Sequence, residues 1–281
     1  MPAMPASDRP LGPRTGKGSI AAVVPVFGED RYLSDVVDGL TAIGLRVTVV
    51  NDGNGDALTA RLRGQGVDVL DLGVNRGVGA ATLAGLRAVV DRGAPGAVAV
   101  DADGAHDLVS VRAVVEGALG DLDALVACDR FSNGNAETIP ITKLDANRFA
   151  AQLFDAATGA RLPDVCCGLR YYPARMAASG WESAGFGFIW ETLAAEHESL
   201  SRLVDCVVHY PVTGPWHTQN RELQHLLHWA GPRVSESVRA TLRPLEDATA
   251  DVVDVRLDDH FRFVRVDAHW WEIRRVRCQT L

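Results

Sequence analysis

The chain has 281 residues, of which 47% are hydrophobic and 23% are charged, and its formal net charge is −8 at pH 7. This composition suits one large globular domain or a domain with an appendage, and it excludes a disordered, collagen-like or repeat-built chain. The acidic balance argues against sequence-independent binding of nucleic acid, and no apolar run approaches the roughly 18 residues that a transmembrane segment requires.

Strand and helix patterns alternate through the first half of the chain, after a Pro- and Gly-containing segment, 1–18, that predicts a disordered lead-in. Continuous apolar runs suit strands that are covered on both faces, and apolar residues three and four apart suit amphipathic helices. The predicted strands are 20–26, 47–50, 67–72, 97–100 and 124–128, and the predicted helices are 32–40, 56–62, 77–90 and 108–119. This alternation predicts an α/β fold with a mostly parallel central sheet flanked by helices.

Polar and glycine-rich segments follow the predicted strands where these end. They are 25–29, 51–53, 75–77 and 101–103, and the last holds two aspartates around one alanine. In open sheets of this kind ligands bind beyond the carboxyl ends of the strands. Carboxylates at two strand ends with a glycine-rich helix start between them suit a nucleotide and its metal ion.

These segments, in this order, resemble the motifs of family 2 glycosyltransferases with the GT-A fold. The family patterns V-I-P-x-Y-N-E, V-V-D-D-G-S, N-x-G-K-G-A-A, D-A-D-G-Q-H and D-x-x-C-G-F-R-x-Y are matched by residues 23–29, 49–54, 75–81, 101–106 and 164–172. The motif pattern is similar to that of the dolichyl- and polyprenyl-phosphate sugar transferases, and it covers roughly residues 20–215. Among the positions that depart from the motifs, Asn51 replaces the first Asp of the second motif, Val78 replaces a Lys, and Ala105 replaces a Gln.

The resemblance implies a Rossmann-like GT-A domain over 19–232, followed by a helix and strand extension over 233–281. Within the domain it implies a nucleotide-sugar-binding half, 19–130, and an acceptor half, 131–232. The residue pattern of the extension predicts short strands, including a hairpin. We expect the extension to form either a homodimer contact or one wall of the acceptor site.

The resemblance also implies an inverting, metal-dependent transfer from a nucleoside-diphosphate sugar, either a UDP- or a GDP-sugar. Asp103 is expected to bind Mg²⁺ or Mn²⁺ directly and to be essential for catalysis, because a hard cation prefers carboxylate oxygens and neutralises the departing pyrophosphate. Asp101 is expected to bind the same ion or to contact the ribose. His217 is a candidate for a third metal ligand.

Other donor-binding residues are carried over from the motifs. Asp52 is expected to accept an N–H of the nucleobase, because an ionised carboxylate only accepts hydrogen bonds. The remaining expected donor contacts are Pro25, Phe27 and Glu29 around the base and ribose, Arg76 at the base or a phosphate, and Arg130 and Arg148 at the pyrophosphate. For the three arginines, a plain solvated surface position is the alternative.

The acceptor half is expected to present the aromatic residues Trp181, Phe186 and Trp190 to the acceptor, with packing in the core as the alternative. If the acceptor is a hydroxyl, Glu191 is the candidate general base; a phosphate acceptor needs no base. We expect a soluble, hydroxyl-bearing small molecule. A polyprenyl phosphate acceptor and a non-catalytic nucleotide-sugar-binding protein are the alternatives.

The five cysteines show no C-x-x-C spacing, and an odd number without a framework predicts reduced thiols in a cytoplasmic protein.

Overall fold

The computed structural model describes residues 18–28, 30–131, 139–198, 202–205, 218–247 and 250–276. The chain divides into two compact units. The first comprises Met1–Arg130, Cys167–Phe188 and Glu198–His209; the second comprises Phe131–Cys166, Ile189–His197 and Tyr210–Leu281. The first unit thus contains residues of both expected halves, 19–130 and 131–232, and its first segment ends at Arg130. Residues 233–281 share a unit with 131–166, and most of the predicted lead-in lies outside the described residues.

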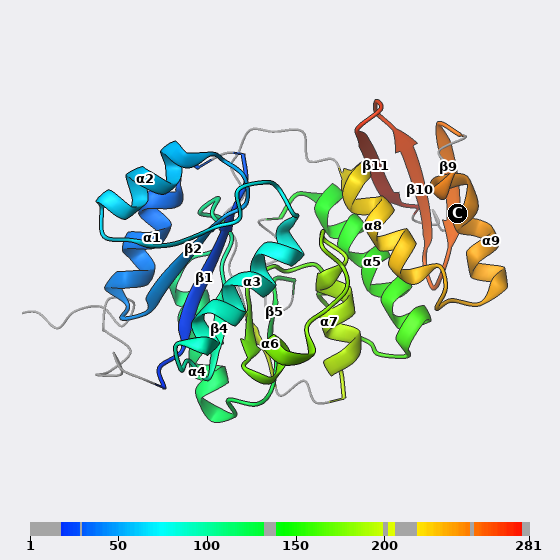
Figure 1. The fold of residues 1–281 in the computed structure, drawn as a ribbon. Coiled ribbons are helices and arrows are strands. Elements are labelled where there is room, and N and C mark those ends of the chain that lie inside the picture. Colours follow the sequence, from blue (N-terminus) through cyan, green and yellow to red (C-terminus); the bar gives the residue numbers. More distant parts are fainter. Residues whose placement is uncertain are drawn as a thin grey trace, which may run out of the picture. The chain divides into compact units, whose positions relative to one another are not determined.

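A seven-stranded sheet forms the centre of the first unit, with the strand order β3-β2-β1-β4-β6-β5-β7 (Figure 1). Its strands are β1 (Ala21–Val26), β2 (Arg46–Asn51), β3 (Asp68–Asp71), β4 (Gly96–Ala99), β5 (Val126–Asp129), β6 (Arg170–Pro173) and β7 (Arg202–Asp205). The pairs of β1 with β2 and β4, of β2 with β3, and of β5 with β7 are parallel. Only β6 runs antiparallel to its neighbours, β4 and β5, among the described strands of this sheet.

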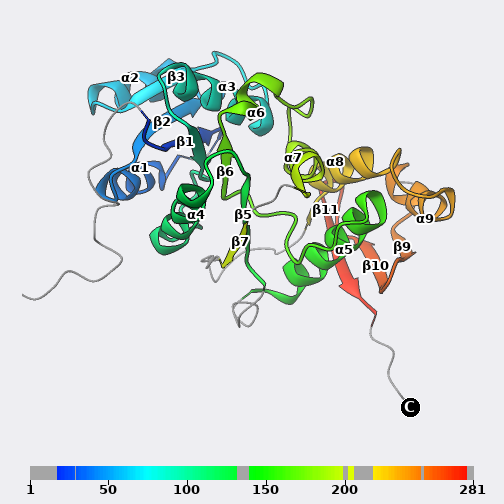
Figure 2. The same cartoon turned by 90° about the horizontal axis from the view of Figure 1, so that it is seen from below.

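Helices cover both faces of this sheet. They are α1 (Leu33–Ala42), α2 (Asp56–Gly64), α3 (Val78–Asp91), α4 (Leu108–Gly120) and α6 (Arg175–Ser179). Figure 2 shows α3 and α6 on one face and α1 and α4 on the other. Gly85 lets α3 approach closely, because a Cβ there would lie 2.4 Å from a methyl of Val23 and 2.8 Å from a methyl of Val50. The apolar run of β1 is buried on both faces as predicted, and the α/β fold with helices on both faces is confirmed.

The second unit packs helices against a smaller antiparallel sheet with the order β8-β11-β10-β9. The strands are β8 (Thr218–Gln219), β9 (Val252–Arg256), β10 (His260–Arg265) and β11 (Trp270–Arg275). The helices are α5 (Ile141–Thr158), most of α7 (Phe188–Glu196), α8 (Asn220–Ala230) and α9 (Glu236–Glu246). Phe261 and Phe263 are buried on either side of the exposed Arg262 in β10, and their rings lie 5.4 Å and 4.8 Å from that of Phe149 on α5. The predicted β-rich extension with a hairpin is confirmed.

α8 and α9 are separate helices, because Gly231 and Pro232 interrupt the chain between them and Ser235 caps the second one. No helix within the described ranges is long and apolar enough to span a membrane.

Candidate functional site

The carboxyl ends of β2, β1 and β4 lie side by side in the first unit, because these three neighbouring strands are parallel. The segments that follow them contain Phe27, Asp52 and the Asp101–Asp103 pair. The backbone N–H of Asp52 donates to the carbonyl of Val26 at 2.9 Å, which joins the ends of β2 and β1. The strand-end motifs that the sequence singled out are thus brought to one edge of the sheet.

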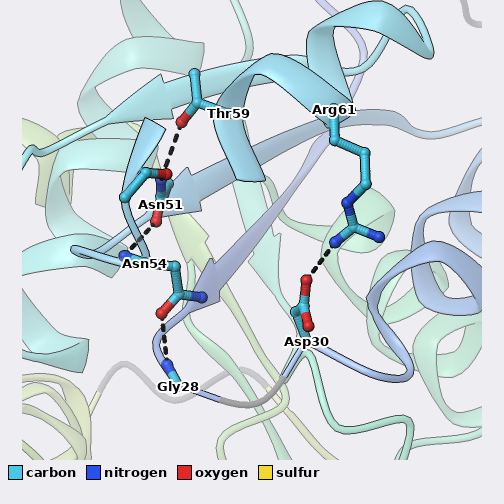
Figure 3. Close-up of polar contacts among 7 residues, drawn as sticks. Gly28, Asp30, Asn51, Asn54, Thr59 and Arg61 are labelled. Atoms are coloured by element: carbon cyan, nitrogen blue, oxygen red, sulfur yellow. Dashed lines mark hydrogen bonds and ion pairs between the residues drawn. The ribbon is translucent and has the colours of Figure 1, made fainter. Parts of the chain in front are cut away.

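Asn51 organises the turn after β2 (Figure 3). It is fully buried, its Nδ2 donates to Oγ1 of Thr59 at 2.9 Å, and its Oδ1 accepts from the N–H of Asn54 at 2.8 Å. Asn54 then accepts from the N–H of Gly28 at 2.6 Å, which ties this turn to the segment after β1. Nearby, Arg61 of α2 pairs with Asp30. Asn51, which departs from the family motif, therefore stabilises the turn after β2 through these hydrogen bonds.

The carboxylate of Asp71 explains why an amide suits this position. Nδ2 of Asn51 lies 3.5 Å from Oδ2 of Asp71, and Thr59 donates to the same oxygen. The hydrogen bonds from Thr59 and from the N–H of Gly73 lower the pKa of Asp71, although burial acts against them. An aspartate at position 51 would place a second carboxylate beside an ionised one.

Asp52 fastens the turn after β2 to the start of α3. Only 2% of it is exposed, and its two oxygens accept from the N–H groups of Arg76 at 2.7 Å and Gly77 at 2.9 Å. Gly53 has a φ of +98°, and a Cβ there would lie 2.5 Å from the backbone nitrogen of Asn75. The second and third motifs are therefore in direct contact, and glycine is required where their backbones meet.

The glycines at the start of α3 also have a packing role that the sequence did not reveal. A Cβ on Gly77 would lie 2.5 Å from the carbonyl oxygen of Ala184, and one on Gly79 would lie 2.3 Å from that of Ser183. The N–H of Ala80 donates to the carbonyl of Ala184 at 3.0 Å. The segment around residues 183–185 thus lies directly against the helix start.

His106 and Cys167 join the aspartate pair after β4. Nδ1 of His106 lies 3.7 Å from Oδ2 of Asp101, and its Nε2 lies 3.7 Å from Sγ of Cys167. Gly168 is close as well, since a Cβ there would be 2.8 Å from a carboxylate oxygen of Asp101. The motif around residues 164–172 therefore reaches the D-x-D segment. The only sequence signal for His106 and Cys167 is that each lies within one of the matched motifs, 101–106 and 164–172.

The charged groups of this cluster shift one another's pKa values. Loss of hydration raises the pKa of Asp101, and repulsion from Asp103 acts in the same direction, whereas His106 and Arg130 act against it. Burial alone would lower the pKa of His106, but Cys167 and the two aspartates outweigh it and raise that pKa to about 9. Arg130 is thus close enough to influence the aspartate pair electrostatically.

Two expected metal ligands, Asp101 and Asp103, lie in one segment. Asp103 accepts from the N–H of Ala105 at 2.9 Å, which shapes the turn after β4. Within the described ranges, no group of three His, Cys, Asp or Glu side chains is arranged to hold a metal ion. His217 and Glu29, also expected at the site, lie outside the described residues.

The remaining expected residues fall in both units. In the first, Pro25 lies within β1, Phe27 is 56% exposed, and the exposed Arg76 lines a pocket of about 240 Å³ together with Arg87 and Trp181. Phe186, also in the first unit, is half-buried. In the second unit, Arg148 is exposed on α5.

The expected acceptor aromatics are packed rather than open. The indole N–H of Trp181 donates to the carbonyl of Gly79 at 2.9 Å, and its ring lies 5.6 Å from that of Phe188. Trp190 is only 4% exposed and lies 6.5 Å from the ring of Trp229 in the second unit. Glu191, in the first turn of α7, is half-buried.

Comparisons with known proteins agree with the motifs. The family model described as glycosyl transferase family 2 matches residues 21–178, which is more than half of the chain. The uncharacterized protein MJ1222 of Methanocaldococcus jannaschii is 27% identical over 133 residues, which are 47% of this chain and 55% of that protein. The chain thus spans about half the length of this curated relative.

Solved structures give a more distant likeness. TarS of S. aureus has a TM-score of 0.45 at 12% identity, covering 81% of this chain and 42% of TarS. A structure of TarS 1–349 in complex with UDP-GlcNAc also has a TM-score of 0.45, at 11% identity, and covers 83% of this chain and 72% of that one.

Proposed function

This chain belongs to glycosyl transferase family 2, and we propose that it is a glycosyltransferase that moves a sugar from a nucleoside-diphosphate sugar to a hydroxyl of a soluble small molecule, with inversion. The observation that supports this most directly is the Asp101–Asp103 pair after β4, at the sheet edge where β1 and β2 also end. Ligands of open α/β sheets bind at this edge.

We propose that Asp101 and Asp103 hold Mg²⁺ or Mn²⁺. The residues fit such an ion, because two carboxylates that repel each other offer the oxygen ligands that hard cations prefer. When bound, the cation supplies charge neutralisation for the departing diphosphate. His217 remains a proposed further ligand.

On the donor side, each residue's proposed role follows from its position. Phe27 is exposed at the end of β1 and offers a ring face to the base. Pro25 and Glu29 are proposed as further contacts of the base and ribose. Asp52 already accepts two backbone N–H groups, but a carboxylate has about four acceptor sites, so a contact with the base stays open to it. Arg76 and the guanidinium of Arg130, which acts on Asp101, are proposed to contact the diphosphate.

The transfer itself is a displacement at the anomeric carbon. The acceptor oxygen forms a bond to that carbon while the bond to the diphosphate oxygen breaks, and the diphosphate leaves with its electron pair. Glu191 is proposed to take the hydroxyl proton, and Trp181, Phe186 and Trp190 to shape the acceptor side. The described cysteines Cys128, Cys166 and Cys167 are thiols, which supports the proposed cytoplasmic location.

The experiment that tests this function measures release of nucleoside diphosphate from UDP- and GDP-sugars with Mg²⁺, with Mn²⁺ or with chelator. Asp103→Asn is compared with Asp38→Asn, an exposed aspartate on α1. We expect metal-dependent turnover that Asp103→Asn abolishes and Asp38→Asn retains. Unchanged turnover of Asp103→Asn, or full activity in chelator, contradicts the metal role. Acceptor panels of soluble alcohols and polyprenyl phosphate then decide the acceptor class, and absence of any turnover indicates a binding protein.

A further inference from the structure

The second unit holds a cavity of about 540 Å³ between α5, the segment 161–163 and the end of β11. All of its lining residues belong to the second unit. Its volume lies within the range of about 300–1,000 Å³ that is typical of small-molecule sites. Polar and charged side chains supply much of the wall, and six of its residues decide which ligand it suits: Asp145, Asn147, Arg148, Ala151, Arg161 and Arg275.

Two buried polar side chains of α5 are fixed in the inner wall. Oδ2 of Asp145 accepts from the backbone N–H of Arg275 at 2.9 Å, which holds the end of β11 against the helix. Nδ2 of Asn147 donates to the carbonyl of Pro163 at 2.9 Å, which holds the opposite segment. Asp145 is 8% and Asn147 is 6% exposed, so the wall is built from anchored side chains.

Two buried atoms of this wall have no hydrogen-bond partner among the residues that the structure describes. They are Oδ1 of Asn147, an acceptor, and Nε of Arg275, a donor. Buried polar atoms in native proteins are nearly always paired, with protein groups, water or ligand. A hydroxyl group both donates and accepts, so a ligand with several hydroxyls satisfies both atoms and also donates to Asp145.

On the exposed side of the cavity, Arg148 is a cation that pairs with no described aspartate, although the lining as a whole holds three arginines and three aspartates. Arg148 is exposed and makes no hydrogen bond or ion pair with the described residues, whereas Arg161 is paired with Asp155 at 3.0 Å. A free guanidinium recognises carboxylate and phosphate groups, because it donates two parallel hydrogen bonds to them. The wall therefore favours a ligand with hydroxyls at one end and an anionic group at the other.

We propose that this cavity binds a polyhydroxylated small molecule that carries a carboxylate or a phosphate group. Its hydroxyls pair with Asp145, Asn147 and Arg275, and its anionic group pairs with Arg148. This binding goes beyond the proposed sugar transfer, and it is measured without turnover.

The test is isothermal titration of the full chain with four probes. Gluconate and glucose 6-phosphate carry hydroxyls and an anion, sorbitol carries hydroxyls only, and inorganic phosphate is an anion only. We expect gluconate or glucose 6-phosphate to bind at least about ten-fold more tightly than sorbitol and phosphate. Tighter binding of gluconate identifies the anionic group as a carboxylate, and tighter binding of glucose 6-phosphate identifies it as a phosphate. No binding of either up to about 10 mM overturns the proposal.

Two variants place the binding in this cavity. Arg148→Ala is expected to weaken the binding of gluconate or glucose 6-phosphate about ten-fold, to the affinity measured for sorbitol. Arg239→Ala, which changes an exposed arginine on α9, is expected to leave this affinity unchanged. Ala151→Phe fills the cavity and is expected to abolish binding of every probe, whereas Ala240→Phe on α9 does not. Circular dichroism confirms that each variant is folded.

The opposite results refute the assignment. Anionic-probe binding that survives in folded Ala151→Phe lies elsewhere on the protein. If Arg148→Ala weakens UDP or GDP binding and leaves gluconate and glucose 6-phosphate binding unchanged, this arginine serves the sugar donor and the proposal fails.

Discussion

Oδ2 of Asp52 accepts a hydrogen bond from the backbone N–H of Gly77 at 2.9 Å, and this contact joins the turn after β2 to the residue before α3. The other oxygen accepts from the N–H of Arg76 at 2.7 Å. Two motifs that lie about 25 residues apart in the sequence are thus held together by one buried carboxylate. The shape of the edge at which we propose the donor to bind depends on it.

We predict that Asp52→Asn lowers the stability of the first unit by about 1–3 kcal/mol. The amide nitrogen would face a backbone N–H, so one buried donor would lose its acceptor. Urea denaturation measures the change, and Asp38→Asn, exposed on α1, serves as the control with no loss. Binding of UDP or GDP should weaken together with stability. Unaltered stability would mean that the carboxylate does not hold this turn.

Asn51→Asp restores the family residue, yet we predict that it destabilises the protein by about 1–3 kcal/mol near pH 7. The new carboxylate would lie beside that of Asp71 and would lose the donation to Thr59. Asn75→Asp, at an exposed asparagine, is the matched control, because it adds the same charge without placing a carboxylate in a buried site. Denaturation should show a loss for the first variant and none for the second. Equal losses would contradict the explanation from charge.

The pH dependence of stability should report on Asp71. Its folded pKa lies below the usual value of 3.8, mainly because Thr59 donates to it, so its contribution is present above that value and is lost as pH falls through the folded pKa. We predict that Thr59→Val raises the pKa of Asp71 and makes stability fall less steeply below about pH 4. NMR titration and acid denaturation measure both quantities. Thr41→Val on α1, whose hydroxyl donates to a carbonyl only, should change neither.

The sequence predicts the α/β fold because β1, β2 and β4 are apolar runs of strand length followed by polar turns. It also predicts that the segments at 51–54, 75–77 and 101–103 meet, since the carboxyl ends of parallel strands share an edge. The family match agrees with this interpretation. The position of β6 between β4 and β5 is not predictable this way, because strand order in a sheet depends on long-range pairing that no local pattern records.

Contacts between distant residues were also beyond the sequence patterns. His106 and Cys167 are 61 residues apart, and only the antiparallel return of β6 beside β4 brings Cys167 to the turn after β4. In the same way, Gly79 reads as part of a donor loop, whereas its lack of a side chain admits the backbone of Ser183. Burial and close backbone approach decide such roles, and both depend on the complete fold.

Glu191 provides the test of the acceptor class. If the acceptor is a hydroxyl, Glu191→Gln should lower turnover by about 10²-fold or more while binding of the nucleoside diphosphate is kept, because an amide cannot take the proton. Glu198→Gln, an exposed glutamate just beyond α7, is the control and should retain turnover. A phosphate acceptor is already ionised, so its glycosylation needs no base. Efficient transfer to polyprenyl phosphate that is unchanged in Glu191→Gln would therefore reject both the soluble acceptor and the catalytic role of this residue.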